Sequence, residues 1–171
     1  DLVTVDTIWK KRSTAVCYAN NEFYIGTTDG CFLISPDKSV IALGKQVPDL
    51  QSHISQIIEG ENDMMWIATY GKGVIGLKDR KVVINLNTQN GLSSNIIRTL
   101  ALHRNTLWVG TDKGLNKIDI SGPDYPIVHF TTADGLASNV VNAIYADGSN
   151  IYLGSPSGIT YFNESKVMMD S

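Results

Sequence analysis

The chain has 171 residues, of which 43% are apolar, and its formal net charge is −3. This length and apolar content suffice for one globular domain with a hydrophobic core. The acidic balance argues against nucleic acid or an anionic membrane as the main partner, because both attract basic surfaces. The short basic run Lys10-Lys11-Arg12 is expected to be a solvated loop.

One tetrapeptide recurs four times: an aromatic residue, an aliphatic residue, Gly or Ala, and then Thr or Ser. The four copies are Tyr24-Ile25-Gly26-Thr27, Trp66-Ile67-Ala68-Thr69, Trp108-Val109-Gly110-Thr111 and Tyr152-Leu153-Gly154-Ser155. Their small third residues are separated by 42, 42 and 44 positions. A fixed period of this length is typical of stacked supersecondary units, so the sequence predicts a repeat architecture.

The similarity extends on both sides of the tetrapeptide. A glycine and then an apolar residue follow each copy, at Gly30-Cys31, Gly73-Val74, Gly114-Leu115 and Gly158-Ile159. Upstream, Gly91-Leu92-Ser93-Ser94-Asn95 returns as Gly135-Leu136-Ala137-Ser138-Asn139, and in altered form as Asp49-Leu50-Gln51-Ser52-His53.

In chain order, the residues 1–8, with the run Leu2-Val3-Thr4-Val5, are expected to form the last strand of a preceding unit. Four units follow, over roughly 9–43, 50–86, 92–131 and 136–169. Each is predicted to contain four short antiparallel strands, because its β-branched and aromatic runs are bounded by Gly, Asp, Asn and Ser. No window has the spacing of a long amphipathic helix.

The third unit shows the expected strands most clearly, at Ile96–Leu102, Leu107–Thr111, Leu115–Ile120 and Ile127–Thr131. Other predicted strands are Lys81–Leu86, which ends the second unit, Val140–Ala146, which begins the fourth, and Lys166-Val167-Met168-Met169, which ends the fourth. The turn between the second and third strands needs a glycine with positive φ, as in Thr28-Asp29-Gly30 and Asp112-Lys113-Gly114. The turn Tyr70-Gly71-Lys72-Gly73 is one residue longer and should project differently.

Residues two apart on a strand share a face, so Trp108 points the same way as Gly110, and Trp66 the same way as Ala68. A large ring beside a missing side chain lets one sheet receive its neighbour. Four-stranded sheets of about 42 residues, packed face to face, form β-propellers. We therefore predict an all-β chain of four propeller blades. The structural residues of the repeat are expected to be Gly26, Trp66, Trp108, Gly110, Gly114, Asn95 and Asn139.

Both ends of the chain fall inside repeats, which favours a segment of a larger array. The alternative is a closed four-blade ring in which Leu2–Val5 competes for the last sheet edge.

The pattern Gly-Leu-x-x-Asn, an apolar strand, and Leu-Trp-Val-Gly-Thr-x-x-Gly-Leu resembles the two-component regulator propeller repeat. Gly91 to Ile120 shows it almost complete, and Gly135 to Phe162 differs mainly by Tyr152 and Ser155. The second unit departs from the pattern at His53 and Ala68, and the first lacks the Gly-Leu-x-x-Asn segment. Together the four units cover almost the whole chain.

The resemblance implies a seven-bladed propeller array in the ectodomain of a hybrid two-component sensor histidine kinase of the Bacteroidetes type. It implies a periplasmic location in a membrane-anchored sensor that recognises oligosaccharides derived from polysaccharides. Its partners would be that ligand, the neighbouring blades of the parent chain and a second parent subunit in a dimer. The kinase module would lie outside this segment, which is itself expected not to be an enzyme.

No catalytic or cofactor motif is found. The three histidines, His53, His103 and His129, lie in different units without metal-ligand spacing. Cys17 and Cys31 fall on strands separated by a third strand, hence about 9.5 Å apart, whereas a disulfide needs Cα atoms within about 7 Å. Both are predicted to be small apolar core residues. We expect no metal and no cofactor.

Candidate ligand contacts are positions where the repeats differ on one face. The connections between units and the turns between the second and third strands share an end, and by family analogy this end binds ligand. The candidates are Tyr70, Lys72, His53, Lys113 and Arg12, with Pro156 and Trp9 in addition. A tyrosine beside a cation suits a sugar with hydroxyl or carboxylate groups. An ordinary solvated loop remains the alternative.

Two other function classes stay open. A propeller enzyme, such as a polysaccharide lyase or a streptogramin-type lyase, would need clustered His, Glu and Arg on the binding face. A non-catalytic interaction scaffold would need a large apolar surface without polar groups for sugars.

Overall fold

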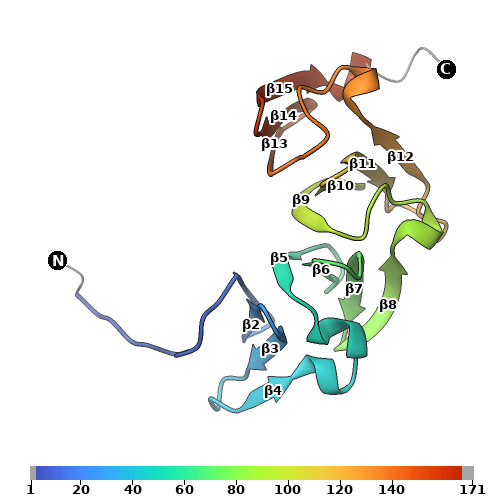
Figure 1. Cartoon of the computed structure of the whole chain (residues 1–171). Coiled ribbons are helices and arrows are strands. Elements are labelled where there is room, and N and C mark those ends of the chain that lie inside the picture. The colour runs from blue at the N-terminus through green and yellow to red at the C-terminus, as the bar shows by residue number, and fades with distance from the viewer. Residues whose placement is uncertain (1–2, 167–171) are drawn as a thin grey trace.

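The structure, a computed structural model, describes residues 3–166 and consists of four antiparallel sheets arranged in an open arc (Figure 1). The first sheet contains β1 (Ala15–Ala19), β2 (Glu22–Thr27), β3 (Gly30–Ile34) and β4 (Val40–Ala42). The second contains β5 (Ile54–Glu59), β6 (Met65–Thr69), β7 (Val74–Lys78) and β8 (Lys81–Leu86). The third contains β9 (Ile97–His103), β10 (Thr106–Thr111), β11 (Gly114–Asp119) and β12 (Ile127–Phe130). The fourth contains β13 (Ala143–Asp147), β14 (Asn150–Ser155) and β15 (Gly158–Asn163).

Only short 3-10 helices accompany these strands in the described part of the chain. They are η1 (Leu43–Lys45), η2 (Pro48–Gln51), η3 (Thr88–Asn90), η4 (Thr132–Asp134) and η5 (Glu164–Lys166). Within each sheet, strands that follow one another in the chain are hydrogen-bonded neighbours. The first strands of the sheets line the concave side of the arc and the fourth strands its convex side (Figure 1). The predicted all-β propeller-blade fold is thus confirmed.

Some strand ends differ from the prediction. The strand expected to begin at Val140 begins at Ala143, because the residues before it bond elsewhere. Val140 N donates to Ser138 Oγ at 3.1 Å, and Val141 N donates to the Thr111 carbonyl of the third sheet at 2.9 Å. These residues therefore tie two sheets together before the strand begins.

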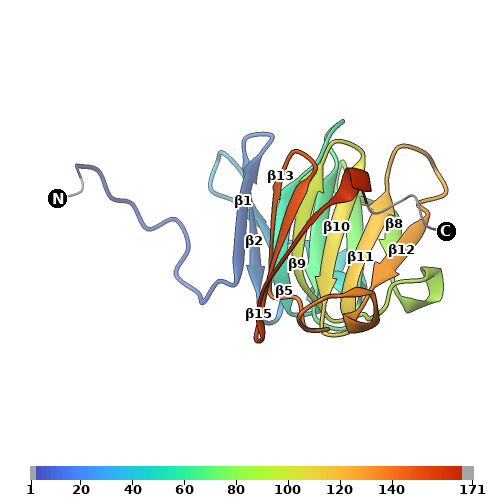
Figure 2. The ribbon, with the colours of Figure 1, turned by 90° about the horizontal axis from the view of Figure 1, so that it is seen from above.

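The N-terminal residues form no strand with the four sheets, and their assignment to a preceding unit stays a prediction. Residues 3–8, expected to form a strand with Leu2, have no strand structure. They extend away from the four sheets (Figures 1 and 2), and a strand without a partner has no ladder hydrogen bonds to hold it. At the other end, η5 covers residues 164–166, and the rest of the predicted strand Lys166–Met169 lies outside the described residues.

Three hydrophobic clusters fill the spaces between successive sheets. The first, around Leu33 and Ile67, joins the first two sheets, and the second, around Trp66 and Leu100, joins the second and third. Trp108 belongs to the third cluster, between the third and fourth sheets, and is 1% exposed. Burying a ring of this size removes 150–250 Å² of surface from water, so the tetrapeptide aromatics are central to the inter-sheet packing.

The small third residue of the tetrapeptide lies where the next sheet approaches. A Cβ at Gly26 would come within 2.6 Å of Ile54 Cγ2, and a Cβ at Gly110 within 2.8 Å of Val141 Cγ1. Such distances are too short for a real side chain, so the repeat requires a small residue at these positions.

The arc does not close on itself. Sheet contacts join the first to the second, the second to the third and the third to the fourth. The first and fourth sheets stand at opposite ends of the arc in Figure 1. The closed four-blade ring is therefore not adopted by the described residues.

Candidate ligand-binding end of the sheets

The turns β2–β3, β6–β7, β10–β11 and β14–β15 lie at the same end of their sheets as the connections between sheets; we call this the connection end. Two of these turns, β6–β7 and β10–β11, bond to the connection that enters the next sheet. Gly71 N and Gly73 N donate to the Asn95 carbonyl at 2.9 and 3.1 Å, and Gly114 N donates to the Asn139 carbonyl at 2.6 Å. These two turns are thus fixed relative to the neighbouring sheet.

A hydroxyl group at the end of each tetrapeptide shapes these turns. The hydroxyls of Thr27, Thr69, Thr111 and Ser155 donate to the carbonyl of the turn glycine at 2.8–3.0 Å. Each also accepts a backbone N–H within the turn. This hydroxyl position was not among the residues predicted from the sequence. The recurrence of Thr, Thr, Thr and Ser was the available signal, because a single hydroxyl oxygen can both donate and accept a hydrogen bond.

Tyr70 and His53 are brought into contact by the longer turn of the second sheet. Their ring centroids are 4.6 Å apart with planes inclined by 36°. The backbone holds the pair, since Tyr70 N donates to the His53 carbonyl at 2.9 Å. Tyr70 also forms an isolated antiparallel bridge with Ile96 of the third sheet. Both side chains are half-buried, so each presents part of its ring to solvent.

Lys72 lies two residues beyond Tyr70 in the same turn. Its backbone N–H donates to Thr69 Oγ1 at 2.9 Å, and the residue is exposed. The extra residue of this turn is accommodated by Gly71 and Gly73, whose φ angles are +116° and +77°. The turn therefore carries an exposed lysine two residues beyond the aromatic pair at the connection end.

The two repeated asparagines serve the turns. Asn95 Oδ1 accepts from Thr88 N, and Asn139 Oδ1 accepts from Thr132 N, each at 2.8 Å. These bonds fix the loops that precede β9 and β13. Their side-chain oxygens are thus engaged in local structure.

The other sequence candidates are dispersed over the connection end. Lys113 is exposed in the β10–β11 turn, Pro156 is exposed in the β14–β15 turn, and Arg12 is exposed before β1. Trp9 packs against Phe32 at 5.3 Å between ring centroids, so it has a packing contact with the first sheet. Of the predicted site residues, the structure brings His53 and Tyr70 into contact, and Lys72 lies two residues beyond Tyr70 in the same turn.

Sequence reasoning missed a line of inter-sheet hydrogen bonds at the starts of the first strands. Thr14 Oγ1 donates to the Ile54 carbonyl at 2.5 Å, and Ser55 Oγ donates to the Ile97 carbonyl at 2.6 Å. At the equivalent position in the third sheet, Arg98 Nε donates to Asn142 Oδ1 at 2.7 Å. Four different residue types occupy this position in the four sheets, so it does not recur as a motif in the sequence.

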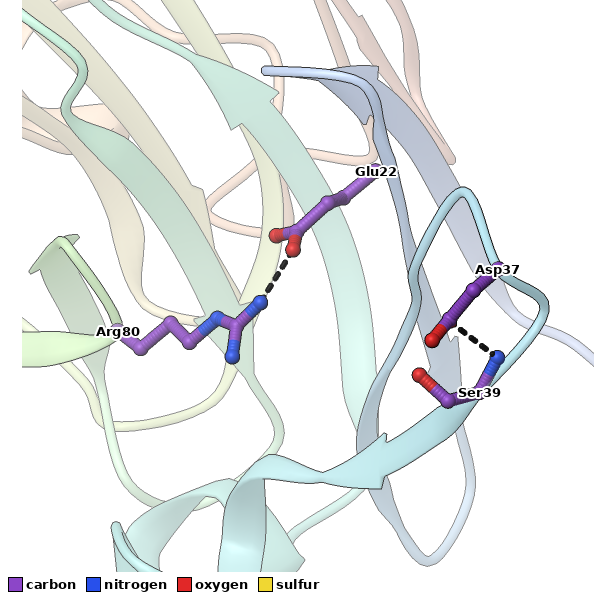
Figure 3. Close-up of polar contacts among 4 residues, drawn as sticks. All are labelled: Glu22, Asp37, Ser39 and Arg80. Carbon is purple, nitrogen blue, oxygen red and sulfur yellow. Dashed lines mark hydrogen bonds and ion pairs between the residues drawn. The ribbon is translucent and has the colours of Figure 1, made fainter.

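Polar contacts at the opposite end of the sheets are structural. Glu22 and Arg80 form an ion pair between the first and second sheets, and Asp37 accepts from Ser39 N at 2.9 Å within a turn (Figure 3). The hydrogen bonds from Ser39 hold the pKa of the Asp37 carboxyl below its usual range. A cavity of about 450 Å³ at this end is lined by residues that include Ile8, Tyr18 and Phe23. It lies away from Tyr70.

Neither cysteine forms a disulfide: both Cys17 and Cys31 are free thiols. Burial raises the pKa of Cys31 to about 12, as expected for a core residue. Among residues 3–166, no group of three or more His, Cys, Asp or Glu side chains could hold a metal ion. In the same range, no helix is long and apolar enough to cross a membrane.

Comparison with solved structures places the fold among propellers. The chain is similar to the extracellular domain of a protein described as a hybrid two-component system, BT3049 from B. thetaiotaomicron, with a TM-score of 0.71 and 20% identity over 90% of this chain. It is similar to the extracellular domain of BT4673 from the same organism, with a TM-score of 0.53 and 18% identity over 92% of this chain. It is also similar to the WD40 β-propeller domain of Doa1, with a TM-score of 0.64 and 14% identity over 89% of this chain.

The chain spans 21% of the BT3049 domain, 28% of the BT4673 domain and 51% of the Doa1 domain. No family model matches the sequence, and no curated protein matches it. At these identities the likeness defines the class of fold, which is that of β-propeller blades.

Proposed function

We propose that this chain is a non-catalytic ligand-recognition segment of a two-component sensor ectodomain, and that it binds oligosaccharides derived from polysaccharides. In this proposal it belongs to the two-component regulator propeller repeats and works outside the cytoplasmic membrane, in the periplasm. Adjoining blades of a longer parent chain would flank the arc, and the parent would act as a dimer.

The observation that carries the proposal is the contact between His53 and Tyr70 beside Lys72. Aromatic faces bind the apolar face of a sugar ring, and the phenolic hydroxyl, imidazole and ammonium groups can bond its polar edge. The β6–β7 turn that carries Tyr70 and Lys72 is anchored to Asn95 of the next sheet, so the site needs little reorganisation on binding. The fold likeness to two sensor ectodomains supports the same class of function.

Signalling would follow if the ligand binds two arrangements of the ectodomain with unequal affinity. A ligand shifts an equilibrium between two ectodomain arrangements only when it binds one of them more tightly. The Tyr70 turn contacts two sheets, through His53 and Ile96, so a ligand there could distinguish two relative positions of those sheets.

Calorimetric titration with a panel of neutral and acidic oligosaccharides tests this function, with product analysis of the same mixtures. We expect saturable binding without turnover. Tyr70→Ala should weaken binding by about tenfold or more, which corresponds to roughly 1.4 kcal/mol. Lys72→Ala should weaken binding of acidic sugars most, whereas Lys81→Ala, at an exposed position on β8, serves as the matched control. Turnover would instead favour the lyase alternative.

An interaction scaffold is the second candidate, because large side chains are exposed on the two end sheets. Ile159 is 76% exposed and Val16 is 66% exposed. If no oligosaccharide of the panel binds to the native chain or to Tyr70→Ala, the interaction scaffold becomes the favoured function in place of the sensor segment.

A further inference from the structure

A cavity of about 310 Å³ lies between the second and third sheets, at the end opposite to the Tyr70 turn. Both of its walls belong to sheets that have a neighbouring sheet on each side. The second sheet supplies Trp66 and Lys78 to the lining, and the third supplies Arg104 and Tyr125. A volume near the lower end of the range for small-molecule sites suits a ligand with a single ring.

Trp66 gives this cavity a buried wall with a free hydrogen-bond donor. The residue is 2% exposed, and its Nε1–H donates to no group among residues 3–166. Trp108 Nε1 is fully enclosed, whereas Trp66 Nε1 is not. A Cβ at Gly60 would lie 2.8 Å from Trp66 Nε1, so this glycine leaves the N–H edge of the indole uncovered. Because an indole nitrogen can only donate, it favours an acceptor in the cavity.

Tyr125 forms a second aromatic wall and has an uncommon backbone conformation. Its φ is +46°, which is disfavoured for a bulky residue with an L configuration. Its ring centroid lies 6.2 Å from that of Trp66, with the planes inclined by 75°. Tyr125 belongs to the connection 120–126 between β11 and β12, and the corresponding connections 35–39 and 79–80 of the first two sheets contain no aromatic residue. Backbone strain of this kind gathers at ligand sites.

Two cations line the same cavity without a carboxylate partner. Lys78 ends β7, and Arg104 lies in the β9–β10 turn. Neither forms an ion pair within the described part of the chain. Glu61 is the one carboxylate of the lining, so two positive charges stand against one negative charge. The chain as a whole has a net charge of −3, which makes this local excess of positive charge unusual for it.

These cations do not recur in the other units. Arg104 stands four residues before its tetrapeptide, where the first two units have Asn20 and Asn62. Lys78 stands five residues after its turn glycine, where the third unit has Asp119. The equivalent cavity between the first and second sheets has the opposite charge balance, with the charged lining residues Glu22, Asp63, Asp79 and Arg80. A purely structural role would recur from unit to unit, so the two cations favour a ligand at this one junction.

We propose that the cavity between the second and third sheets binds a small organic anion, namely a single aromatic ring that bears a carboxylate. The ring packs against Trp66 and Tyr125, and the carboxylate accepts hydrogen bonds from Arg104 and Lys78. Arginine suits this role because its guanidinium can donate two parallel N–H bonds to one carboxylate. A neutral sugar would leave both cations unpaired, and an inorganic anion would leave the aromatic walls uncovered. The site is separate from the Tyr70 turn and does not depend on sugar binding there.

Calorimetric titration of the chain with 4-hydroxybenzoate tests this proposal, with 4-hydroxybenzamide as the neutral analogue. We expect saturable binding of the acid and binding of the amide that is weaker by about tenfold or more, because hydrogen bonds to a charged group contribute about that much. Arg104→Asn places there the residue of the equivalent Asn62, and it should weaken binding of the acid by a similar factor, as should Lys78→Gln. Lys45→Gln removes the same charge from an exposed position on η1 and is the matched control, with unchanged affinity.

The indole N–H signals locate the ligand in the same titration followed by two-dimensional NMR. The Trp66 Nε1–H signal should shift, whereas that of Trp108, whose Nε1 is fully enclosed, should stay in place. No saturation below about 10 mM, equal affinity for the acid and the amide, or an unshifted Trp66 signal would overturn the proposal. An equal loss of affinity in Lys45→Gln would also overturn it, since attraction to the overall charge would then explain the binding.

Discussion

Val141, just before the fourth sheet, lies against Gly110 of the third so closely that a Cβ at Gly110 would be 2.8 Å from Val141 Cγ1. The same added atom would be 2.6 Å from Thr99 Cγ2. Gly110 therefore has no room for a side chain where the fourth sheet packs against the third. This contact explains why the repeat has a small residue at this position.

The first prediction concerns this contact. Gly110→Ala should lower the free energy of unfolding by about 1–3 kcal/mol, because overpacking a filled site displaces its neighbours. Urea denaturation should show the loss as a lower midpoint with a similar slope. Gly154→Ala is the control, because the added Cβ makes only an ordinary 3.4 Å contact with Ala143, and it should change the free energy of unfolding little. Equal losses in the two variants would contradict the proposed role of Val141.

The second prediction concerns the turn hydroxyls. Thr111 Oγ1 donates to the Gly114 carbonyl at 2.9 Å, accepts from Lys113 N at 2.9 Å and lies 3.1 Å from Ser93 Oγ. Thr111 is fully buried, so Thr111→Val should cost about 1–3 kcal/mol by leaving buried polar groups unpaired. Ser155→Ala removes the equivalent bonds at a turn that solvent reaches, and it should cost clearly less. Thermal unfolding of both variants provides the comparison.

The third prediction concerns alkaline pH. Burial raises the pKa of the Cys31 thiol from 9.0 to about 12. Above pH 9 the unfolded chain loses this proton while the folded chain keeps it, so the free energy of unfolding should fall as the pH rises from 9 toward 12. Cys31→Val places there the residue found at the equivalent Val74, and it should reduce this alkaline slope.

A remaining slope is expected in the Cys31→Val protein, because burial also raises the pKa values of Cys17 and Tyr24. Denaturant midpoints measured at intervals between pH 8 and pH 11 give the two slopes. Identical slopes in the native and Cys31→Val proteins would contradict the buried position of this thiol.

Much of the fold could be predicted from the repeat, because local patterns decide where strands and turns form. Lys81–Leu86 was predicted as a strand and forms β8 with those bounds. Residues 3–8 have the composition of a strand but no partner, and composition does not record whether a partner exists. The delayed start of β13 likewise depends on the bond from Val141 N to Thr111, which joins residues distant in sequence.

The candidate site was predictable only where the repeat breaks its own pattern. The extra residue in Tyr70-Gly71-Lys72-Gly73 drew attention to the turn, and the altered His53 drew attention to its partner. Their stacking could not be read from the sequence, since it depends on how β5 and β6 align. The Arg98–Asn142 bond was missed for a related reason, because side chains of different chemistry meet there between sheets.

The central claim is that the turn bearing Tyr70 is the ligand-binding surface of this chain. The most direct measurement is a two-dimensional amide NMR titration of the chain with whichever oligosaccharide of the panel binds, or with each in turn. We predict that the largest shift changes occur at His53, at Tyr70–Gly73 and at Asn95. Changes centred on the opposite end, around Glu22 and Arg80, or no changes with any sugar, would contradict the account.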